Sequence, residues 1–216
     1  GGAERVVFCD REGFIGFNEM IAFISRMAIK ETGKKKVATS VETGRLLDWA
    51  VRDLGGEVVR GIVGDCDVAY LARDINAAIG VEATGVYILP EVGFYPDSMV
   101  AALLLLSHAV HGGEIRDFFA RMPRLFFEKT RIRCPNEMKE EVIGQIMKKA
   151  CLFEANSINV TDGLRLEYDD AWMLIRASGT EPAIRLMSES TSRATTMKLI
   201  AAGVEAIHSC LARVEI

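Results

Sequence analysis

One short stretch near the C-terminal end carries side chains that could grip a phosphate group. It begins at Arg176 and reads Arg-Ala-Ser-Gly-Thr-Glu-Pro-Ala-Ile-Arg. Arg176 can donate a forked pair of charge-assisted hydrogen bonds, and Ser178 and Thr180 each add a hydroxyl donor. Gly179 lets backbone N–H groups approach an anion without a Cβ in the way, and Arg185 adds positive charge. The stretch therefore predicts an anion-binding loop, although the same residue types are also common in ordinary turns.

The segments on either side of this loop are apolar. Residues 171–175 read Ala-Trp-Met-Leu-Ile, and residues 184–187 read Ile-Arg-Leu-Met. Short apolar runs that end at a polar, glycine-containing segment are typical of strands joined by a tight loop. We therefore expect a strand, the loop and a second strand in that order.

The order Arg-x-Ser-Gly-Thr-Glu-Pro-x-x-Arg resembles the phosphate-binding loop of the phosphohexomutases, a family that includes phosphomannomutase, phosphoglucomutase and phosphoglucosamine mutase. The similarity runs in order through nearly the whole chain and corresponds to the last two domains of the family. The resemblance implies that the loop holds whichever phosphate of the substrate is not reacting. The residues to which it assigns this role are Arg176, Ser178, Gly179, Thr180 and Arg185.

A second loop resembles the sugar-binding loop of the same family. Residues 81–86 read Val-Glu-Ala-Thr-Gly-Val, where family members have Gly-Glu-x-Ser-Gly-His or Gly-Glu-Gly-Asn-Gly. The resemblance implies that Glu82 accepts hydrogen bonds from two neighbouring sugar hydroxyls and that Thr84 can also hydrogen-bond the sugar. Val86 replaces a residue that is often histidine or glycine, so one contact is expected to be missing. Asp65 follows a similar strand-end loop, but we expect it to cap the next helix.

The start of the chain departs from the family pattern. The family holds Mg²⁺ with the aspartates of an Asp-Gly-Asp-x-Asp-Arg loop, and here only Glu4 and Arg5 match it. One glutamate is a poor site for a hard divalent cation. The phosphoserine loop of the family belongs to a first domain that this chain does not contain. We therefore expect Mg²⁺ only in an intact enzyme, with the N-terminal domains as partners. We assign no metal ligand and no catalytic residue to this chain, and expect no turnover by it alone.

Composition excludes several other classes of protein. The 216 residues carry a net charge of −4 with no basic stripe, which argues against a nucleic-acid partner. The longest apolar run, residues 99–106, is too short to span a bilayer, so we expect no membrane partner. The five cysteines are scattered and form no Cys-x-x-Cys pair, which favours free thiols in a reducing cytoplasm over zinc.

The resemblance implies that residues 1–12 are a remnant of a preceding domain, and the spacing of apolar residues predicts two domains after it. Strands alternate with helices over residues 13–115, which predicts a three-layer α/β/α domain with a parallel sheet. Residues 116–216 predict a smaller α+β domain, an antiparallel sheet with helices on one side. The resemblance implies that the first domain binds the sugar and the second binds phosphate. The first helix is expected to start at the N-cap Asn18, and the helix over residues 97–110 to be largely buried. Residues 118–127 are expected to form a linker or an edge strand.

Two other functions are also compatible with the sequence. The chain could be a sugar-phosphate-binding or regulatory protein that lost the phosphoryl-transfer parts, or a structural dimerising protein with vestigial loops. Binding of a hexose phosphate that weakens in Arg176→Ala would exclude the structural protein. The sequence does not identify the hexose, because mannose, glucose and N-acetylglucosamine phosphates differ at one carbon.

Overall fold

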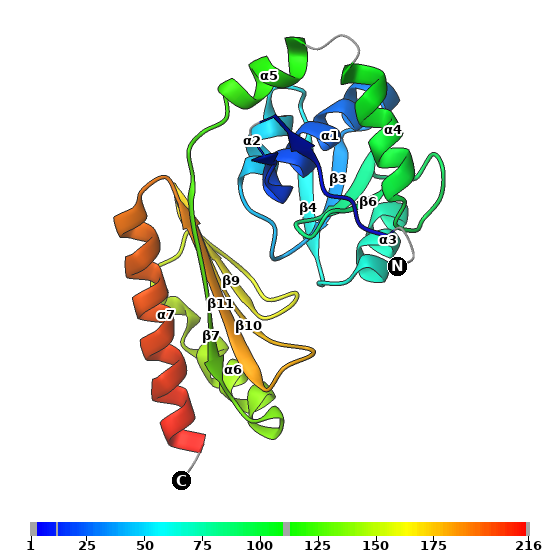
Figure 1. The fold of residues 1–216 in the computed structure, drawn as a ribbon. Helices are drawn as coiled ribbons and strands as arrows, with labels where there is room; N and C mark the ends of the chain where they lie inside the picture. Colours follow the sequence, from blue (N-terminus) through cyan, green and yellow to red (C-terminus); the bar gives the residue numbers. More distant parts are fainter. Residues whose placement is uncertain (1–3, 12, 110–112, 215–216) are drawn as a thin grey trace. The chain divides into compact units, whose positions relative to one another are not determined.

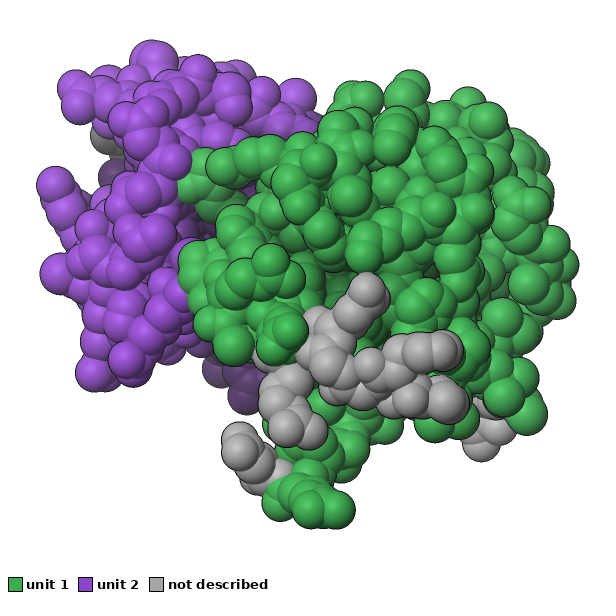
Figure 2. Space-filling view, turned by 90° about the horizontal axis from the view of Figure 1, so that it is seen from above, with its two compact units in different colours: residues 1–123 green, residues 124–216 purple. Residues whose placement is uncertain are grey.

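The computed structural model describes residues 4–11, 13–109 and 113–214. The chain forms two compact units, Gly1–Pro123 (unit 1) and Arg124–Ile216 (unit 2), which Figure 2 shows in green and purple. Residues 1–3 and 12 of the expected N-terminal remnant lie outside the described residues. None of the helices that the structure describes is both long enough and apolar enough to span a membrane.

Unit 1 contains a four-stranded sheet in the order β4-β3-β5-β6. Its strands are β3 (Lys36–Ser40), β4 (Glu57–Gly61), β5 (Ile79–Glu82) and β6 (Val86–Ile88). β3 runs parallel to β4 and β5, as predicted, whereas β6 is antiparallel to β5. The prediction of a parallel sheet is therefore wrong at this edge. Only three residues join β5 to β6, and a parallel pair needs a crossover of a dozen residues or more.

Helices cover both faces of this sheet, which confirms the three-layer prediction (Figure 1). α1 (Phe17–Thr32) and α2 (Leu46–Arg52) pack together on one face, and α3 (Asp65–Asp74) packs on the other. The approach of α3 is close, because a Cβ on Gly80 of β5 would lie 3.1 Å from the side chain of Val68.

The first helix begins earlier than we expected. Gly16 occupies the N-cap position of α1, so Asn18 lies within the first turn and the prediction that it caps the helix is wrong. Gly16 already has the extended backbone of a cap residue, with φ −58° and ψ 147°.

α4 (Ser98–Ala109) is only partly buried, so the prediction that this helix is largely buried is wrong. The side chains of Met99, Leu103 and Leu106 are 67%, 63% and 59% exposed, whereas Ala101 is fully buried. α4 packs at the sheet edge, against β6, α1 and α5 (Gly113–Ala120), and only one stripe of it meets those neighbours. A helix that is apolar all round carries no sequence signal of which side faces outward.

The prediction of a linker or an edge strand over residues 118–127 is wrong only for residues 118–120, which end α5 (Gly113–Ala120). Residues 121–125 form a turn and a linker, and residues 126–127 begin the edge strand β7 (Phe126–Arg133). Within α5, the ring of Phe118 lies 5.3 Å from the rings of Phe23 and Trp49, measured between centroids. These contacts attach the residues up to Pro123 to unit 1, whereas we expected the boundary between residues 115 and 116.

Unit 2 is an antiparallel five-stranded sheet with helices on one face, as predicted (Figure 1). In sheet order its strands are β7 (Phe126–Arg133), β11 (Ala183–Ser190), β10 (Ala171–Ala177), β9 (Leu164–Glu167) and β8 (Ser157–Asn159). The covering helices are α6 (Lys139–Lys148) and α7 (Arg193–Val214), with short 3₁₀ turns at Asn136–Met138 and Ala150–Phe153.

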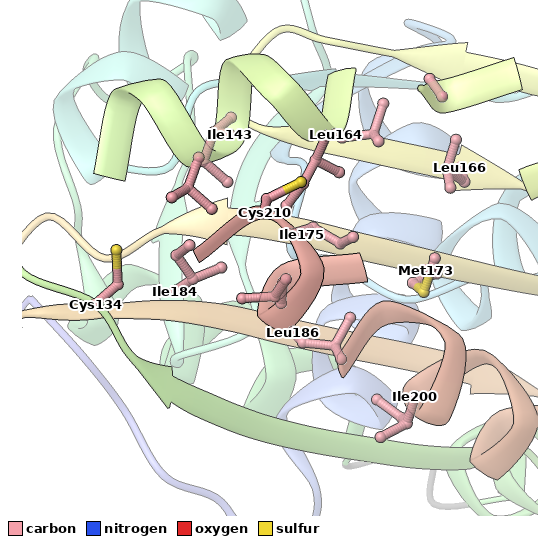
Figure 3. Close-up of a cluster of buried hydrophobic side chains, with 14 residues drawn as sticks. Cys134, Ile143, Leu164, Leu166, Met173, Ile175, Ile184, Leu186, Ile200 and Cys210 are labelled. Carbon is pink, nitrogen blue, oxygen red and sulfur yellow. The ribbon is translucent and has the colours of Figure 1, made fainter. Parts of the chain in front are cut away.

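The core of unit 2 lies between this sheet and its two helices (Figure 3). Ile175, Ile184 and Leu186 of the two central strands are fully buried there, together with Ile207 and Cys210 of α7. Alternate residues of β10 and β11 face this core, so the residues between them, including Arg176 and Arg185, point to the opposite face. The candidate phosphate loop therefore starts from two rigid central strands.

Two short strands complete the fold. β1 (Cys9–Asp10) and β2 (Gly13–Phe14) pair with each other in an antiparallel ribbon near the start of the chain. Both strands are exposed, and they belong to unit 1.

Candidate functional site

The candidate phosphate loop connects β10 to β11, which confirms the strand–loop–strand prediction. Arg176 and Arg185 stand opposite each other in the last part of this ladder. The backbone N–H of Ser178 donates to the carbonyl oxygen of Ala183 at 2.9 Å and closes the loop. Gly179 and Thr180 are exposed at its tip, where a ligand could reach them.

Arg176 is held in place by an aspartate from a neighbouring turn. Its Nε donates to Oδ2 of Asp162 at 2.8 Å, and both side chains are largely buried. The turn that presents Asp162 requires glycine at the next position, because Gly163 has φ +85°. A Cβ there would collide with the carbonyl oxygen of Ile175 and lie 2.9 Å from Cα of Arg176. Asp162 orients the guanidinium, and the sequence marked it only as part of a tight turn.

A buried lysine supports the loop from within. Nζ of Lys139, at the start of α6, donates to the carbonyl oxygens of Ser178, at 2.7 Å, and of Glu181. Lys139 is only 8% exposed, and the hydroxyl of Ser178 is turned inward, accepting from the N–H of Glu181 at 3.2 Å. The ammonium group thus fixes the main chain of the loop. Sequence reasoning missed Lys139, which lies 39 positions before Ser178 with no motif around it.

Arg185 belongs to a row of three arginines on one face of the sheet. Arg176, Arg185 and Arg131 stand opposite one another on β10, β11 and β7. The carboxylate of Glu181 lies between two of them, 3.1 Å from Arg131 and 3.4 Å from Arg185. The cleft that Arg131, Arg185 and Glu181 line together with Lys129 and Thr130 has a volume of about 280 Å³. The row brings positive charge beside the phosphate loop, and Arg131 was not identified from the sequence.

The candidate sugar loop lies at the carboxyl edge of the unit 1 sheet. Glu82, the last residue of β5, is 8% exposed and accepts a hydrogen bond from the N–H of Gly64 at 3.1 Å. Burial raises the pKa of Glu82, and the Gly64 hydrogen bond opposes that shift. The carboxylates of Asp65 and Glu42 raise its pKa further. Thr84 is exposed at the turn that follows.

Three loops meet at this edge because β3, β4 and β5 run in the same direction. The loop after β3 is tied to β5 by buried hydroxyls. Thr39 Oγ1 donates to the carbonyl oxygen of Val81 at 2.7 Å and lies 2.6 Å from Oγ1 of Thr43. The edge therefore forms a rigid frame around Glu82.

Asp65 does not occupy the cap position that we expected. Gly64 is the N-cap residue of α3, and Asp65 is its first helical residue, with Oδ1 accepting from the N–H of Cys66 at 2.9 Å. The cap falls one residue earlier because Gly64 adopts φ +152°, which L side chains rarely adopt. The carboxylate of Asp65 thus stands in the first turn, near Glu82.

The N-terminal segment adds a positive charge to the same edge. Arg5 pairs with Val86 across an antiparallel bridge, and the N–H of Val6 donates to the carbonyl oxygen of Gly85 at 3.1 Å. Gly85 has φ +83°, and a Cβ there would lie 2.6 Å from the carbonyl oxygen of Val6. The charge of Arg5 lowers the pKa of Glu82, against the larger effect of burial. Arg5 therefore joins the candidate sugar site, which the sequence did not indicate.

The part of the chain that the structure describes offers no site that fits a resident magnesium ion. Glu4, the acidic residue that matches the metal loop of the family, is exposed. Across residues 4–11, 13–109 and 113–214 there is no group of three or more histidine, cysteine, aspartate or glutamate side chains that could hold a metal. Mg²⁺ prefers several oxygen ligands in a near-octahedral arrangement.

Two family models match most of the chain. Residues 17–125 match the model described as phosphoglucomutase/phosphomannomutase, alpha/beta/alpha domain III. Residues 130–206 match the model described as phosphoglucomutase/phosphomannomutase, C-terminal domain. The two matches follow each other in the order of the two units.

Similar curated proteins carry the name "probable phosphoglucosamine mutase". The protein from Methanopyrus kandleri is 36% identical over 217 residues, which cover 99% of this chain and 48% of the relative. The protein from Pyrococcus furiosus is 34% identical over 202 residues, or 93% of this chain and 45% of the relative. The chain thus spans about half the length of the curated relatives that it matches.

Solved structures share the fold. A phosphoglucomutase/phosphomannomutase family protein from Burkholderia thailandensis superposes with a TM-score of 0.84 at 20% identity, over 97% of this chain and 45% of that protein. An N-acetylphosphoglucosamine mutase from Aspergillus fumigatus, solved with GlcNAc-6P and magnesium, gives 0.66 at 15% identity, over 96% of this chain and 50% of that protein.

Proposed function

The chain belongs to the phosphoglucomutase/phosphomannomutase family, and from this membership we propose that it supplies sugar and phosphate recognition to a hexose-phosphate mutase. The enzyme would interconvert a hexose 1-phosphate and a hexose 6-phosphate. The observation that carries the proposal is the buried Arg176, which Asp162 orients beside a loop that Lys139 supports. A preorganised guanidinium next to exposed hydroxyl and N–H donors suits a phosphate dianion.

We propose glucosamine phosphate as the substrate. The curated relatives are named as phosphoglucosamine mutases, and the carboxyl edge of unit 1 has a chemistry that suits an amino sugar. Asp65 and Glu42 are close enough to Glu82 to raise its pKa, so a protonated amine at C2 would relieve the repulsion among the three carboxylates. A neutral hexose would offer only hydroxyl groups to the same carboxylates.

In this scheme the residues of this chain bind and orient, and none of them forms or breaks a bond. A phosphoserine in the other half of the enzyme would give its phosphoryl group to the sugar and yield a bisphosphate. The sugar would then return its other phosphate to the serine, so that the serine and the sugar each carry one phosphate before and after the reaction. Arg176, Ser178, Gly179, Thr180 and Arg185 would neutralise and hold the phosphate that is not transferred, since such catalysis rests on positioning and charge.

Isothermal titration calorimetry of the 216-residue chain with glucosamine 6-phosphate tests the proposal. Arg176→Ala should weaken binding by about 1.5–3 kcal/mol, the value of a charge-assisted hydrogen-bonded contact. Arg193→Ala is the matched control, because it removes the same charge from an exposed position at the start of α7. Equal binding by the wild-type chain and Arg176→Ala would show that the loop assignment is wrong.

The amino-sugar assignment has its own test. Glucose 6-phosphate differs from glucosamine 6-phosphate only at C2, so the wild-type chain should bind it more weakly. The preference should shrink in Glu82→Gln, which removes one of the carboxylates. A chain that binds both sugars equally would contradict the choice of glucosamine and leave the phosphate loop unaffected.

A further inference from the structure

The carboxylate of Glu181 lies between two arginines beside the candidate phosphate loop. Its two oxygens face different guanidinium groups, Oε1 toward Arg131 and Oε2 toward Arg185. A carboxylate held by two arginines has the same charge sign and the same acceptor geometry as one edge of a phosphate. The cleft around it, which Lys129 also lines, is about 280 Å³.

This carboxylate is weakly held. The side chain of Glu181 is 40% exposed, and that of Arg131 is 74% exposed. Ion pairs at such positions contribute little, because water screens them and long side chains lose freedom in forming them. A phosphate dianion carries about twice the charge of a carboxylate and has three acceptor oxygens. It can therefore compete with Glu181 for the arginines.

The main chain of Glu181, in contrast, is fixed. Its N–H donates to Oγ of Ser178, and its carbonyl oxygen accepts from the buried ammonium of Lys139. The side chain can thus leave the arginines by rotation alone, while the loop that carries Ser178 keeps its shape. The loop supplies both a rigid frame and one movable anion.

We propose that the carboxylate of Glu181 mimics the phosphate of the substrate in the unbound chain. The Glu181 side chain then rotates away from Arg131 and Arg185 when that phosphate binds. Arg131 then becomes a further phosphate-binding residue. The inference rests on the proposed function, because it needs a phosphate at this loop. Each binding event must displace the carboxylate, and each release lets it return, so Glu181 lowers the affinity and favours departure of the product.

Glu181→Gln, Arg131→Gln and the double variant test this inference by titration with glucosamine 6-phosphate and, separately, inorganic phosphate. Glu181→Gln should bind about two- to fivefold more tightly, since the competing ion pair is lost. Arg131→Gln should bind about two- to fivefold more weakly. In the Arg131→Gln background, Glu181→Gln should raise the affinity for phosphate by a smaller factor than in the wild-type chain, because the two side chains act through one contact.

Glu128→Gln is the matched control for the change in net charge. It lies on the same strand, β7, is exposed, and faces away from Arg131 because the two positions differ by three residues. Its affinity should stay at the wild-type value. If Glu128→Gln tightens binding as much as Glu181→Gln, the effect is general electrostatics and the inference is wrong.

The remaining outcomes separate this inference from the proposed function. Suppose that the wild-type chain binds glucosamine 6-phosphate and Arg176→Ala does not, but that Glu181→Gln binds it no more tightly than wild type. Only the proposed phosphate mimicry by Glu181 is then overturned. If the wild-type chain binds neither ligand, both proposals fail. The variants should keep the circular dichroism spectrum of the wild-type chain, because Glu181 and Arg131 are exposed enough for glutamine to replace them.

Discussion

Glu82 has a buried carboxylate at the carboxyl edge of the unit 1 sheet, where it accepts a hydrogen bond from the backbone N–H of Gly64. Its burial raises its pKa, so the folded chain binds a proton at this site more tightly than the unfolded chain does. The contribution of Glu82 to stability is therefore fully present below the pKa of the unfolded chain. It is lost as the pH rises through the raised pKa of the folded state.

We expect Glu82→Gln to be more stable than the wild-type chain at neutral pH, because the variant buries no charge. The difference should close as the pH falls below the ordinary pKa of glutamate, about 4.3. Urea unfolding at a series of pH values measures it. Glu57→Gln, at the exposed start of β4, is the control and should show no such trend. A stability difference that is independent of pH would contradict the burial argument.

Lys139 contributes through the carbonyl oxygens that it satisfies. Lys139→Met keeps much of the apolar stem but leaves the carbonyls of Ser178 and Glu181 without their donor. We expect unit 2 to lose about 1–3 kcal/mol of unfolding free energy, the cost of unsatisfied buried polar groups. Lys148→Met changes an exposed lysine at the end of the same helix, and denaturant unfolding should find it close to wild type. Equal losses in both variants would exclude the proposed support of the loop.

At the scale of elements, the ion pair between Asp162 and Arg176 joins the turn between β8 and β9 to the loop between β10 and β11. The turn presents Asp162, and the loop begins at the arginine that Asp162 holds. Each of the two segments contains a glycine, and the structure distinguishes their duties. Gly163 has a positive φ and meets the neighbouring strand, whereas Gly179 has neither feature.

Gly163→Ala should therefore destabilise unit 2 by about 1–3 kcal/mol, as expected for a strained backbone position, and also displace Asp162 from Arg176. Gly179→Ala should fold like the wild-type chain, because no atom lies within 4 Å of the added Cβ. It should nevertheless bind phosphate more weakly if the anion approaches the backbone there. Thermal unfolding and phosphate titration of both variants separate the two roles. Normal stability of Gly163→Ala would refute the steric argument.

At the scale of the whole molecule, the chain spans about half of its curated relatives, and its two units have separate cores. The proposed reaction needs a phosphoserine, and this chain is assigned only binding roles. Catalysis by phosphoryl transfer depends on several groups held in register at once, so recognition alone does not produce turnover.

We expect the 216-residue chain to show no conversion of glucosamine 1-phosphate to glucosamine 6-phosphate in a coupled assay. The full-length product of the gene should convert it, and Arg176→Ala in that protein should lower kcat/KM by about ten- to a hundredfold, the equivalent of one charge-assisted contact. Conversion by the 216 residues alone would show that the assignment of only binding roles to this chain is wrong. An inactive full-length protein would favour a sugar-phosphate-binding or regulatory role.

Much of this architecture could be predicted from the sequence, because it depends on local patterns. The period of apolar residues, the turn residues and the spacing of strands and helices indicated the α/β/α unit and the α+β unit, and both are confirmed. The candidate phosphate loop carries its donors within ten residues, so one segment contains the side chains that the proposal needs. The outward side of α4 and the direction of β6 could not be predicted, because packing partners decide the first and a short turn decides the second.

Only the tertiary structure decided which distant residues join the two candidate sites. Asp162, Lys139 and Arg131 reach the phosphate loop from 14, 39 and 50 positions away from their partners in the sequence. Arg5 reaches Glu82 only because the N-terminal segment pairs with the start of β6. The physical reason is that hydrogen bonds and charges act over a few ångströms in space. The sequence alone thus determined the donors that the candidate phosphate loop carries, and the packing of the strands, the β8–β9 turn and α6 determined which groups hold them.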